Sequence, residues 1–222
     1  MKTSPSLIVM LTHNDFTVKN AAEIFEECKN SAVEYWGMKE QGLPLEDMKL
    51  LCKCMKECGK TTILEVVAYT QEEGLLGAKI AVECGFDILM GTIFSDAIND
   101  YCATHGLKYM PFVGTVTDRP SILSGDINDI INEAKQYVAK GVYGIDLLGY
   151  RYVGDIEALN NALVENIDAP VCIAGSIDTY PKLERMKELN PWGFTIGSAF
   201  FENSFGDSIN QQIDNVINFL NK

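Results

Sequence analysis

The sequence predicts a single (β/α)8 TIM barrel that spans residues 1–222. Three observations lead to this fold class. Short apolar, β-branched runs alternate with longer amphipathic segments from one end of the chain to the other. There are eight runs and eight segments, and 222 residues is near the usual size of one such barrel. No Ser/Gly linker or low-complexity run divides the chain, so we expect one domain.

The predicted strands are the short runs that are rich in apolar and β-branched residues. They are 7–11, 33–38, 62–68, 88–93, 108–113, 143–148, 171–174 and 193–196. The helical patterns between them are 18–29, 44–57, 70–84, 95–105, 126–140, 155–166, 180–189 and 207–220. An open, doubly wound sheet uses the same alternation and is the alternative to the closed barrel.

Glycines mark the ends of several predicted helices. Four helical patterns end just before the next strand at Gly59, Gly85, Gly106 and Gly141. Glycine tolerates the left-handed conformation that ends a helix, so these residues support the helix-to-strand turns of the α/β pattern.

Composition excludes several classes of partner. The formal net charge of −13 argues against nucleic acid, because a phosphate backbone requires a basic surface. No stretch of about 18 apolar residues exists to cross a membrane. The apolar run near the N-terminus is too short for a secretion signal, and the seven cysteines are an odd, scattered set. We therefore expect a cytoplasmic protein with reduced thiols and no membrane partner.

The last two predicted strands end in the same dipeptide. Gly175-Ser176 follows residues 171–174, and Gly197-Ser198 follows residues 193–196. Barrels often bind phosphate at the ends of strands seven and eight, where backbone N–H groups and serine hydroxyls donate to the phosphate oxygens. We expect these four residues to bind the phosphate of a small metabolite. The alternative is that each dipeptide is a tight turn that caps the next helix.

These motifs carry a resemblance to known families. IAGSI (173–177) and IGSAFF (196–201) resemble the strand ends of the ribulose-phosphate-binding barrel superfamily. LLGY (147–150), followed by IAGSI, is similar to N-acetylmannosamine-6-phosphate 2-epimerases. Residues 70–123 are similar in layout to 2-keto-3-deoxy-6-phosphogluconate aldolases. Together the resemblances cover roughly the last two-thirds of the chain and imply a phosphate-binding barrel of the class I aldolase type.

The resemblances end at the reacting groups of both families. The aldolases carry their Schiff-base lysine on strand six, where this chain has Asp146. The epimerases place a glutamate in the strand-seven motif, where this chain has Ala174-Gly175. The chain therefore lacks the main catalytic residues of the two families, and neither activity can be transferred whole.

Three charged residues fall within or at the end of predicted strands. Glu65 interrupts an apolar run, and an unpaired buried carboxylate is costly, so it is a candidate base. Asp146 is in phase with the small Gly144 and is a second candidate base that points into the barrel. Lys39 ends strand two, where an ammonium can stabilise an enolate or an amine can form a Schiff base. The alternatives are structural ion pairs and a solvated loop lysine.

Four further residues follow predicted strands at the mouth of the barrel. His13 is a candidate general acid or base, although the segment could equally cap the following helix through Asn14, Asp15 or Thr17. Arg119 and Arg151 have planar guanidinium groups that suit a carboxylate or phosphate of the substrate. Tyr150 could contribute a hydroxyl or a stacking face to substrate binding.

The sequence predicts no metal and no cofactor. Cys52, Cys54 and Cys58 form no zinc-binding pattern, because no Cys-x-x-Cys pair or neighbouring histidine completes the set. A divalent ion held by Glu65 and Asp146 stays open as an alternative without a sequence signature.

These residues predict an enzyme that abstracts a proton next to the carbonyl of a small phosphorylated sugar or keto acid, as an epimerase, isomerase or aldolase (lyase). Glu65 or Asp146 would act as the base, and Lys39 would stabilise the enolate oxygen. Two alternatives are a Schiff-base aldolase that uses Lys39 and a non-catalytic barrel that binds a phosphorylated ligand. A homo-oligomer also stays open, because barrels of this size often pair.

Overall fold

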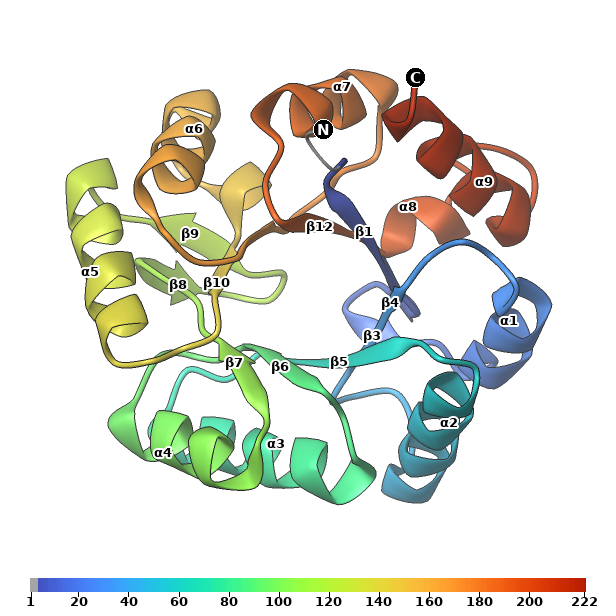
Figure 1. Ribbon diagram of the computed structural model, residues 1–222, viewed down its shortest axis with the longest axis horizontal. Coiled ribbons are helices and arrows are strands. Elements are labelled where there is room, and N and C mark those ends of the chain that lie inside the picture. Colours follow the sequence, from blue (N-terminus) through green and yellow to red (C-terminus); the bar gives the residue numbers. More distant parts are fainter. Residues whose placement is uncertain (1–3) are drawn as a thin grey trace.

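Eight parallel strands form the wall of a barrel in the computed structural model, which describes residues 4–222 (Figure 1). The strands are β1 (Ser6–Met10), β4 (Tyr35–Lys39), β5 (Thr61–Val66), β6 (Ile88–Gly91), β7 (Lys108–Met110), β10 (Ile145–Leu147), β11 (Val171–Ile173) and β12 (Gly193–Ile196). Their order is β10-β11-β12-β1-β4-β5-β6-β7. A parallel bridge between Phe112 and Asp146 joins the two outer strands. The predicted barrel is therefore confirmed, and the open sheet is excluded.

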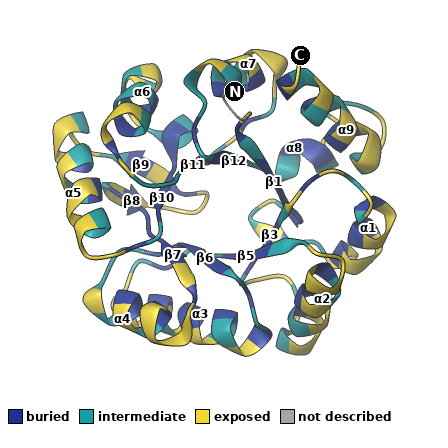
Figure 2. Ribbon diagram, viewed as in Figure 1, coloured by how far each residue is buried: buried dark blue, intermediate teal, exposed yellow. Residues whose placement is uncertain are grey.

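A helix follows each strand and packs on the outside of the barrel (Figure 1). The main helices are α1 (Ala21–Cys28), α2 (Leu45–Glu57), α3 (Gln71–Cys84), α4 (Asp96–His105), α5 (Ile127–Ala139), α6 (Ile156–Asn166), α7 (Tyr180–Leu189) and α9 (Ile209–Leu220). Side chains of Thr70, Ser95, Asp126 and Asp155 cap the first turns of α3 to α6. Gly85 and Gly106 end α3 and α4 in the left-handed conformation, as predicted. Figure 2 shows that these helices expose their outer faces and bury the side that contacts the strands.

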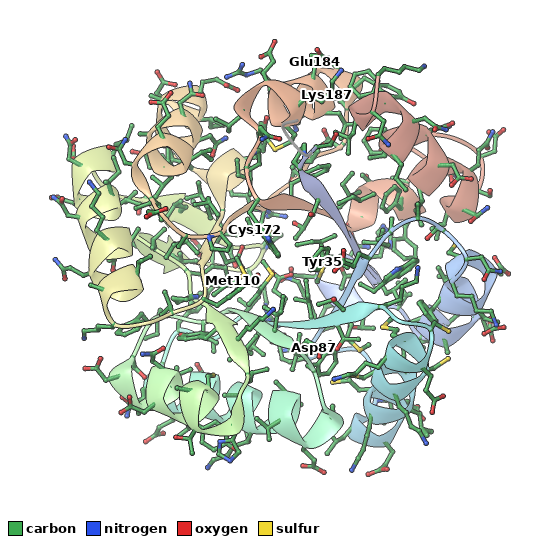
Figure 3. The ribbon with its side chains drawn as sticks, viewed as in Figure 1. Tyr35, Asp87, Met110, Cys172, Glu184 and Lys187 are labelled. Atoms are coloured by element: carbon green, nitrogen blue, oxygen red, sulfur yellow. The ribbon has the colours of Figure 1, made fainter. Side chains whose placement is uncertain are left out.

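The inside of the barrel is apolar except at one end. Ile8, Met10, Ile63, Ile88, Met90, Met110 and Cys172 form a buried cluster along the barrel axis. Figure 3 shows Tyr35, Met110 and Cys172 near that axis. At the end of the barrel where the strands begin, the ring of Trp192 meets two tyrosine rings edge-on. Its centroid lies 5.2 Å from that of Tyr35 and 6.1 Å from that of Tyr143. Because this packing fills the barrel interior where the strands begin, a solvent-facing polar site inside the barrel can form only at the carboxyl ends of the strands.

Two hairpins that the sequence analysis did not predict lie at that end. β2 (Thr12–His13) pairs with β3 (Phe16–Thr17), and β8 (Thr115–Thr117) pairs with β9 (Ile122–Ser124). The first hairpin turns at Asn14 and Asp15, whose φ angles are 49° and 71°. The suggestion that residues 14–17 cap the following helix is wrong, because Asn20 is the N-cap of α1.

Two short helical turns complete the rim, η1 (Gly149–Arg151) and α8 (Ser198–Phe201). Within residues 4–222, no helix has the length and apolar character needed to span a membrane.

Candidate functional site

A cavity of about 650 Å³ opens at the carboxyl ends of the strands, which is within the usual range for small-molecule sites. It lies between two walls. One wall is formed by the segments that follow β11 and β12, and the other by the ends of β4 and β5 with the β2–β3 turn. Most of the predicted site residues line it, namely Lys39, Glu65, Arg119, Arg151, Gly175, Ser176, Gly197 and Ser198.

Gly175-Ser176 turns the backbone into the cavity directly after β11. Gly175 has a φ of 97° and Ser176 a φ of 52°, and a Cβ on Gly175 would lie 2.8 Å from Cγ of Arg151. The N–H groups of both residues donate to no backbone carbonyl among residues 4–222. Ser176 lies before Thr179, which is the N-cap of α7, so it does not cap that helix. Two backbone donors therefore remain available to an anion.

Gly197-Ser198 follows β12 and packs against the extension of β1. A Cβ on Gly197 would lie 2.6 Å from Oγ1 of Thr12, so only glycine permits this approach of the two strand ends. The hydroxyl of Ser198 accepts a hydrogen bond from the N–H of Asn14 at 3.3 Å. That hydroxyl keeps its own proton to donate, and Ser198 lines the cavity.

Arg151 is the cation nearest to Gly175 in this wall. It ends η1, lines the cavity and packs its side-chain stem against the position of Gly175. No ion pair within 4.0 Å neutralises its guanidinium in the part of the chain that the structure describes. A planar, unpaired guanidinium beside free N–H donors is suited to phosphate.

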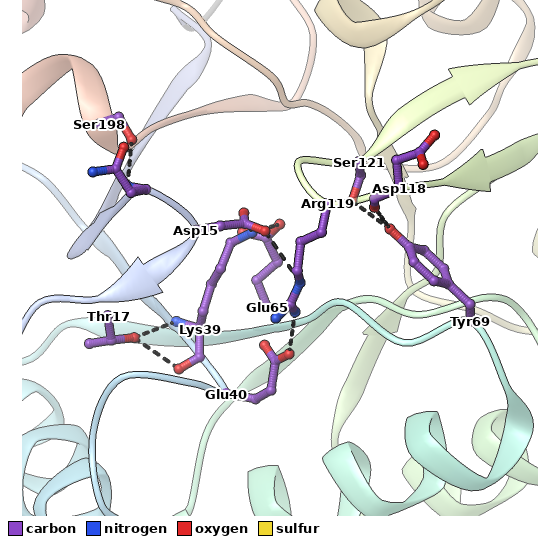
Figure 4. Close-up of polar contacts among 11 residues, drawn as sticks. Asp15, Thr17, Lys39, Glu40, Glu65, Tyr69, Asp118, Arg119, Ser121 and Ser198 are labelled. Carbon is purple, nitrogen blue, oxygen red and sulfur yellow. Dashed lines mark hydrogen bonds and ion pairs between the residues drawn. The ribbon is translucent and has the colours of Figure 1, made fainter.

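Four charged side chains line the opposite wall and a fifth, Glu40, lies behind it; we call them the carboxylate–cation cluster: Asp15, Lys39, Glu40, Glu65 and Arg119. Nζ of Lys39 donates to Oδ1 of Asp15 and lies 3.3 Å from Oε1 of Glu65 (Figure 4). The β4–β5 register places Lys39 directly beside Glu65. Nε of Arg119 lies 3.3 Å from Oδ2 of Asp15, and its Nη2 donates to Oε1 of Glu40 at 2.7 Å. The two hairpin turns and two strand ends thus meet at one point.

Lys39 is held in its charged form. Burial lowers the pKa of Lys39, but the charge of Glu65 and the hydrogen bond and charge of Asp15 outweigh burial, so the pKa is raised. The ammonium can donate hydrogen bonds to a substrate oxygen. A Schiff base requires the neutral amine, and this environment opposes its formation.

Asp146 lies in the floor of the barrel and does not reach the cavity surface. Its side chain is on β10, and the residue is 1% exposed. Burial and the charge of Glu65 raise its pKa well above the ordinary range, and Lys39 offsets only part of this. The N–H of Gly91 favours the charged form, yet no hydrogen bond of normal geometry reaches either carboxyl oxygen. Burial and the neighbouring Glu65 therefore favour the protonated form of Asp146.

His13 and Tyr150 do not line the cavity. The ring of His13 stacks on the ring of Phe201, with centroids 5.7 Å apart, and Nε2 of His13 lies 3.5 Å from Oε1 of Glu202. Burial raises the pKa of Tyr150 to about 12, and its hydroxyl has no hydrogen-bond partner among the described residues. The structure therefore places both outside the group formed by Lys39, Glu65 and Arg119.

Sequence reasoning missed the contributions of Asp15 and Glu40. Asp15 was considered only as a helix cap, although Asn14-Asp15 between two short β-prone pairs is a typical hairpin turn. Glu40 follows Lys39 at the end of β4, and nothing in the sequence shows that Arg119, from a distant segment, pairs with it.

Residues 4–222 contain no group of three or more His, Cys, Asp or Glu side chains arranged to hold a metal ion. The sequence left open a divalent ion held by Glu65 and Asp146. These two carboxyl groups are neighbours, but the ammonium of Lys39 lies 3.3 Å from Oε1 of Glu65, where such an ion would compete with it.

Comparisons with known proteins identify the fold. A scan against protein-family models and a search of curated proteins find no match. Among solved structures, orotidine 5'-phosphate decarboxylase from Pyrococcus horikoshii OT3 is similar with a TM-score of 0.72 and 10% identity, over 97% of this chain and 99% of that one. A structure described as native KDPGal is similar with a TM-score of 0.69 and 12% identity, over 100% of this chain and 95% of that one. N-acetylmannosamine-6-phosphate 2-epimerase from Clostridium perfringens is similar with a TM-score of 0.65 and 14% identity, over 98% of this chain and 93% of that one. At these identities the similarity establishes the TIM-barrel fold, and it does not extend to individual catalytic residues.

Proposed function

We propose that this chain is an enzyme that holds a small phosphorylated sugar or keto acid by its phosphate and abstracts a proton next to the carbonyl. One observation carries the proposal. A charged lysine and a carboxylate 3.3 Å apart, Lys39 and Glu65, line the same cavity as two Gly-Ser loops with unused donors. Structural neighbours that are an epimerase and a decarboxylase, each named for a phosphorylated compound, support the general kind of activity.

The phosphate would bind to the wall formed after β11 and β12. Gly175, Ser176, Ser198 and Arg151 all line this part of the cavity, and their N–H, hydroxyl and guanidinium groups are the donors that would hold the phosphate. Backbone donors matter here because the net charge of −13 repels anions at long range. Binding the distant phosphate would fix the carbonyl end of the substrate against Lys39 and Glu65.

Glu65 is the better base of the two candidates. Glu65 lines the cavity and forms an ion pair with Lys39, whereas Asp146 is buried away from the cavity surface and its raised pKa favours the protonated form. Glu65 would take the proton from the carbon next to the carbonyl, and the Lys39 ammonium would donate a hydrogen bond to the oxygen as it becomes an enolate. Return of the proton to the opposite face of the same carbon gives epimerisation. In an α-hydroxy carbonyl compound, delivery of the proton to the former carbonyl carbon, with transfer of the hydroxyl proton between the two oxygens, gives isomerisation. In an aldol cleavage Glu65 would instead take the proton of the β-hydroxyl group, and the C–C bond between the α- and β-carbons would break to leave the enolate and a second carbonyl compound.

Solvent deuterium incorporation tests the proposal. Phosphorylated sugars and keto acids that bind are incubated in D2O with the wild type, and loss of the carbon-bound proton is followed by NMR. Glu65→Gln should slow the exchange by about 10²–10⁴-fold, because the amide cannot accept the proton. Glu34→Gln is the matched control, because Glu34 is exposed and precedes the opposite end of β4. Exchange at the wild-type rate in Glu65→Gln contradicts this role.

Two further results separate the alternatives. A mass adduct on Lys39 after borohydride treatment during turnover would replace the enolate role of Lys39 by a Schiff base. Tight binding of phosphorylated ligands with no exchange or turnover of any of them would make the barrel a binding protein.

A further inference from the structure

The cations of the cavity differ in whether they are free to bind a substrate. Lys39 and Arg119, in the carboxylate–cation cluster, both contact carboxylates of the chain itself. Arg151, beside Gly175, has no ion-pair partner among residues 4–222. The described part of the cavity therefore offers an unpaired cation at its phosphate wall only.

The cluster already carries more negative than positive charge. Two cations, Lys39 and Arg119, face three carboxylates, those of Asp15, Glu40 and Glu65. A substrate carboxylate placed here would be repelled by the surplus charge, and partial burial strengthens that repulsion because water screens it poorly.

A substrate carboxylate could bind only by displacing one from the protein. The side chains of Asp15 and Glu40 are 15% and 14% exposed, so a displaced carboxylate would stay near the cavity with neither solvent nor a partner. Leaving a largely buried charge unpaired is strongly unfavourable. The ion pairs are therefore expected to persist when a substrate enters.

Beyond its ion pairs, the cluster offers a substrate one hydrogen-bond acceptor at the cavity, the carboxylate of Asp15. The buried Oδ2 of Asp15 accepts no hydrogen bond of normal geometry among the described residues, although it lies 3.3 Å from Nε of Arg119. Asp15 also lines the cavity. Carboxylate oxygens are acceptors, and the hydroxyl groups of a sugar are donors that match them.

From this distribution of charge we infer that the site selects phosphorylated sugars, which carry hydroxyl and carbonyl groups at the reacting end, over phosphorylated keto acids and other sugar acids, and that Asp15 and Glu40 set this preference. The inference narrows the proposed function and rests on it. Asp15 would contact the substrate. Glu40 does not line the cavity and is a positioning residue that acts by neutralising Arg119.

Pairs of phosphorylated ligands in which the aldehyde carbon of one member is oxidised to a carboxylate in the other test the inference. Calorimetric titration at pH 7.5 compares glyceraldehyde 3-phosphate with 3-phosphoglycerate, and glucose 6-phosphate with 6-phosphogluconate. Inorganic phosphate is titrated separately to measure the phosphate wall alone. In the wild type, the acid of each pair should bind at least about tenfold more weakly than its partner.

The Glu40→Gln substitution removes a negative charge and releases Arg119 toward the cavity. The variant should lower the ratio of the two dissociation constants in each pair, acid over sugar phosphate, by about tenfold. Its dissociation constant for inorganic phosphate should stay within about twofold of the wild type. Asp15→Asn is the second variant and should also narrow the preference. Glu165→Gln, on the exposed face of α6, controls for the change in net charge, and circular dichroism confirms folding of each variant.

The outcomes separate the inference from the proposed function. Acids that bind the wild type as tightly as the sugar phosphates that lack the carboxylate, with inorganic phosphate still bound, would overturn the inference and leave the phosphate site standing. An unchanged preference in both Glu40→Gln and Asp15→Asn would overturn the assignment of these residues. Failure of every probe to bind, inorganic phosphate included, would remove both the inference and the proposed function.

Discussion

The two walls of the cavity use polar groups in opposite ways. The wall after β11 and β12 presents donors that the protein leaves unpaired, the N–H groups of Gly175 and Ser176 and the guanidinium of Arg151. The wall after β1, β4 and β5 presents charges that the protein has paired with one another, such as Lys39 with Glu65. Unpaired donors gain most from a ligand, whereas paired charges are already held in position.

Under the proposed function, this difference separates phosphate binding from proton transfer within one cavity. The donor wall can change affinity without contributing to the fold, because its side chain Arg151 has no ion pair to lose. The cluster wall ties the β2–β3 turn, the end of β4 and the β8–β9 turn together through Asp15, Lys39 and Arg119. Changes in the cluster should therefore affect stability as well as activity.

The largest expected effect is on stability, in the cluster wall. Lys39→Met should lower the free energy of unfolding by about 3–5 kcal/mol, because Asp15 and Glu65 lose their shared cation while largely buried. Urea denaturation followed by circular dichroism measures the change. Lys53→Met, at an exposed lysine of α2, should change it by less than about 0.5 kcal/mol. A loss below about 1 kcal/mol for Lys39→Met would show that the cluster is solvated and not preorganised.

A smaller effect, on affinity, is expected in the donor wall. Arg151→Met keeps the side-chain stem against Gly175 and removes the charge. It should weaken inorganic phosphate binding by about 10–100-fold, the range for a charged hydrogen bond, and change the free energy of unfolding by less than about 1 kcal/mol. Calorimetric titration measures the first quantity and urea denaturation the second.

Arg185→Met provides the matched control for that change. Arg185 is on α7 and pairs with Glu157 and Glu188 on the outside of the barrel. The Arg185→Met variant should bind inorganic phosphate with the affinity of the wild type. Equal phosphate affinity in wild type and Arg151→Met would remove Arg151 from the donor wall.

The third expected effect, the smallest for a change of one pH unit, is a pH dependence that comes from Asp146. Its pKa is raised in the folded protein, so between the unfolded value near 4 and the folded value the folded state keeps a proton that the unfolded state releases. Asp146 thus stabilises the fold at acid pH and loses that contribution as pH rises, by up to about 1.4 kcal/mol per pH unit.

Asp146→Asn removes this dependence because asparagine resembles the protonated carboxyl and does not titrate. Unfolding free energies measured in urea from pH 5 to pH 8 should favour the variant increasingly over the wild type as pH rises. A difference between the two proteins that is constant over this range would contradict the raised pKa.

The alternation of strands and helices was readable from the sequence because it depends on local periodicity and on glycine at helix ends. All eight strands and eight main helices are confirmed, with boundaries that shift by a few residues. The inward direction of Asp146 followed from its phase with Gly144. These features need no knowledge of distant contacts, which explains why a single sequence predicts them.

The cluster could not be read in the same way. Its members come from residues 15, 39, 40, 65 and 119, which approach one another only when the barrel closes and the two hairpins fold over its mouth. The hairpin strands β2 and β3 have two residues each, too few for a periodic pattern. Sequence reasoning therefore identified Lys39, Glu65 and Arg119 singly, without showing that Arg119 is neutralised.

The most direct test of the account is a thermal-shift panel that compares each phosphorylated sugar or keto acid with its dephosphorylated form. The account predicts that phosphorylated members alone raise the melting temperature, by an amount that corresponds to about 2.7 kcal/mol at a hundred times the dissociation constant. Stabilisation by dephosphorylated and phosphorylated members alike, or by no member of the panel, would contradict a phosphate site at Gly175-Ser176 and Gly197-Ser198.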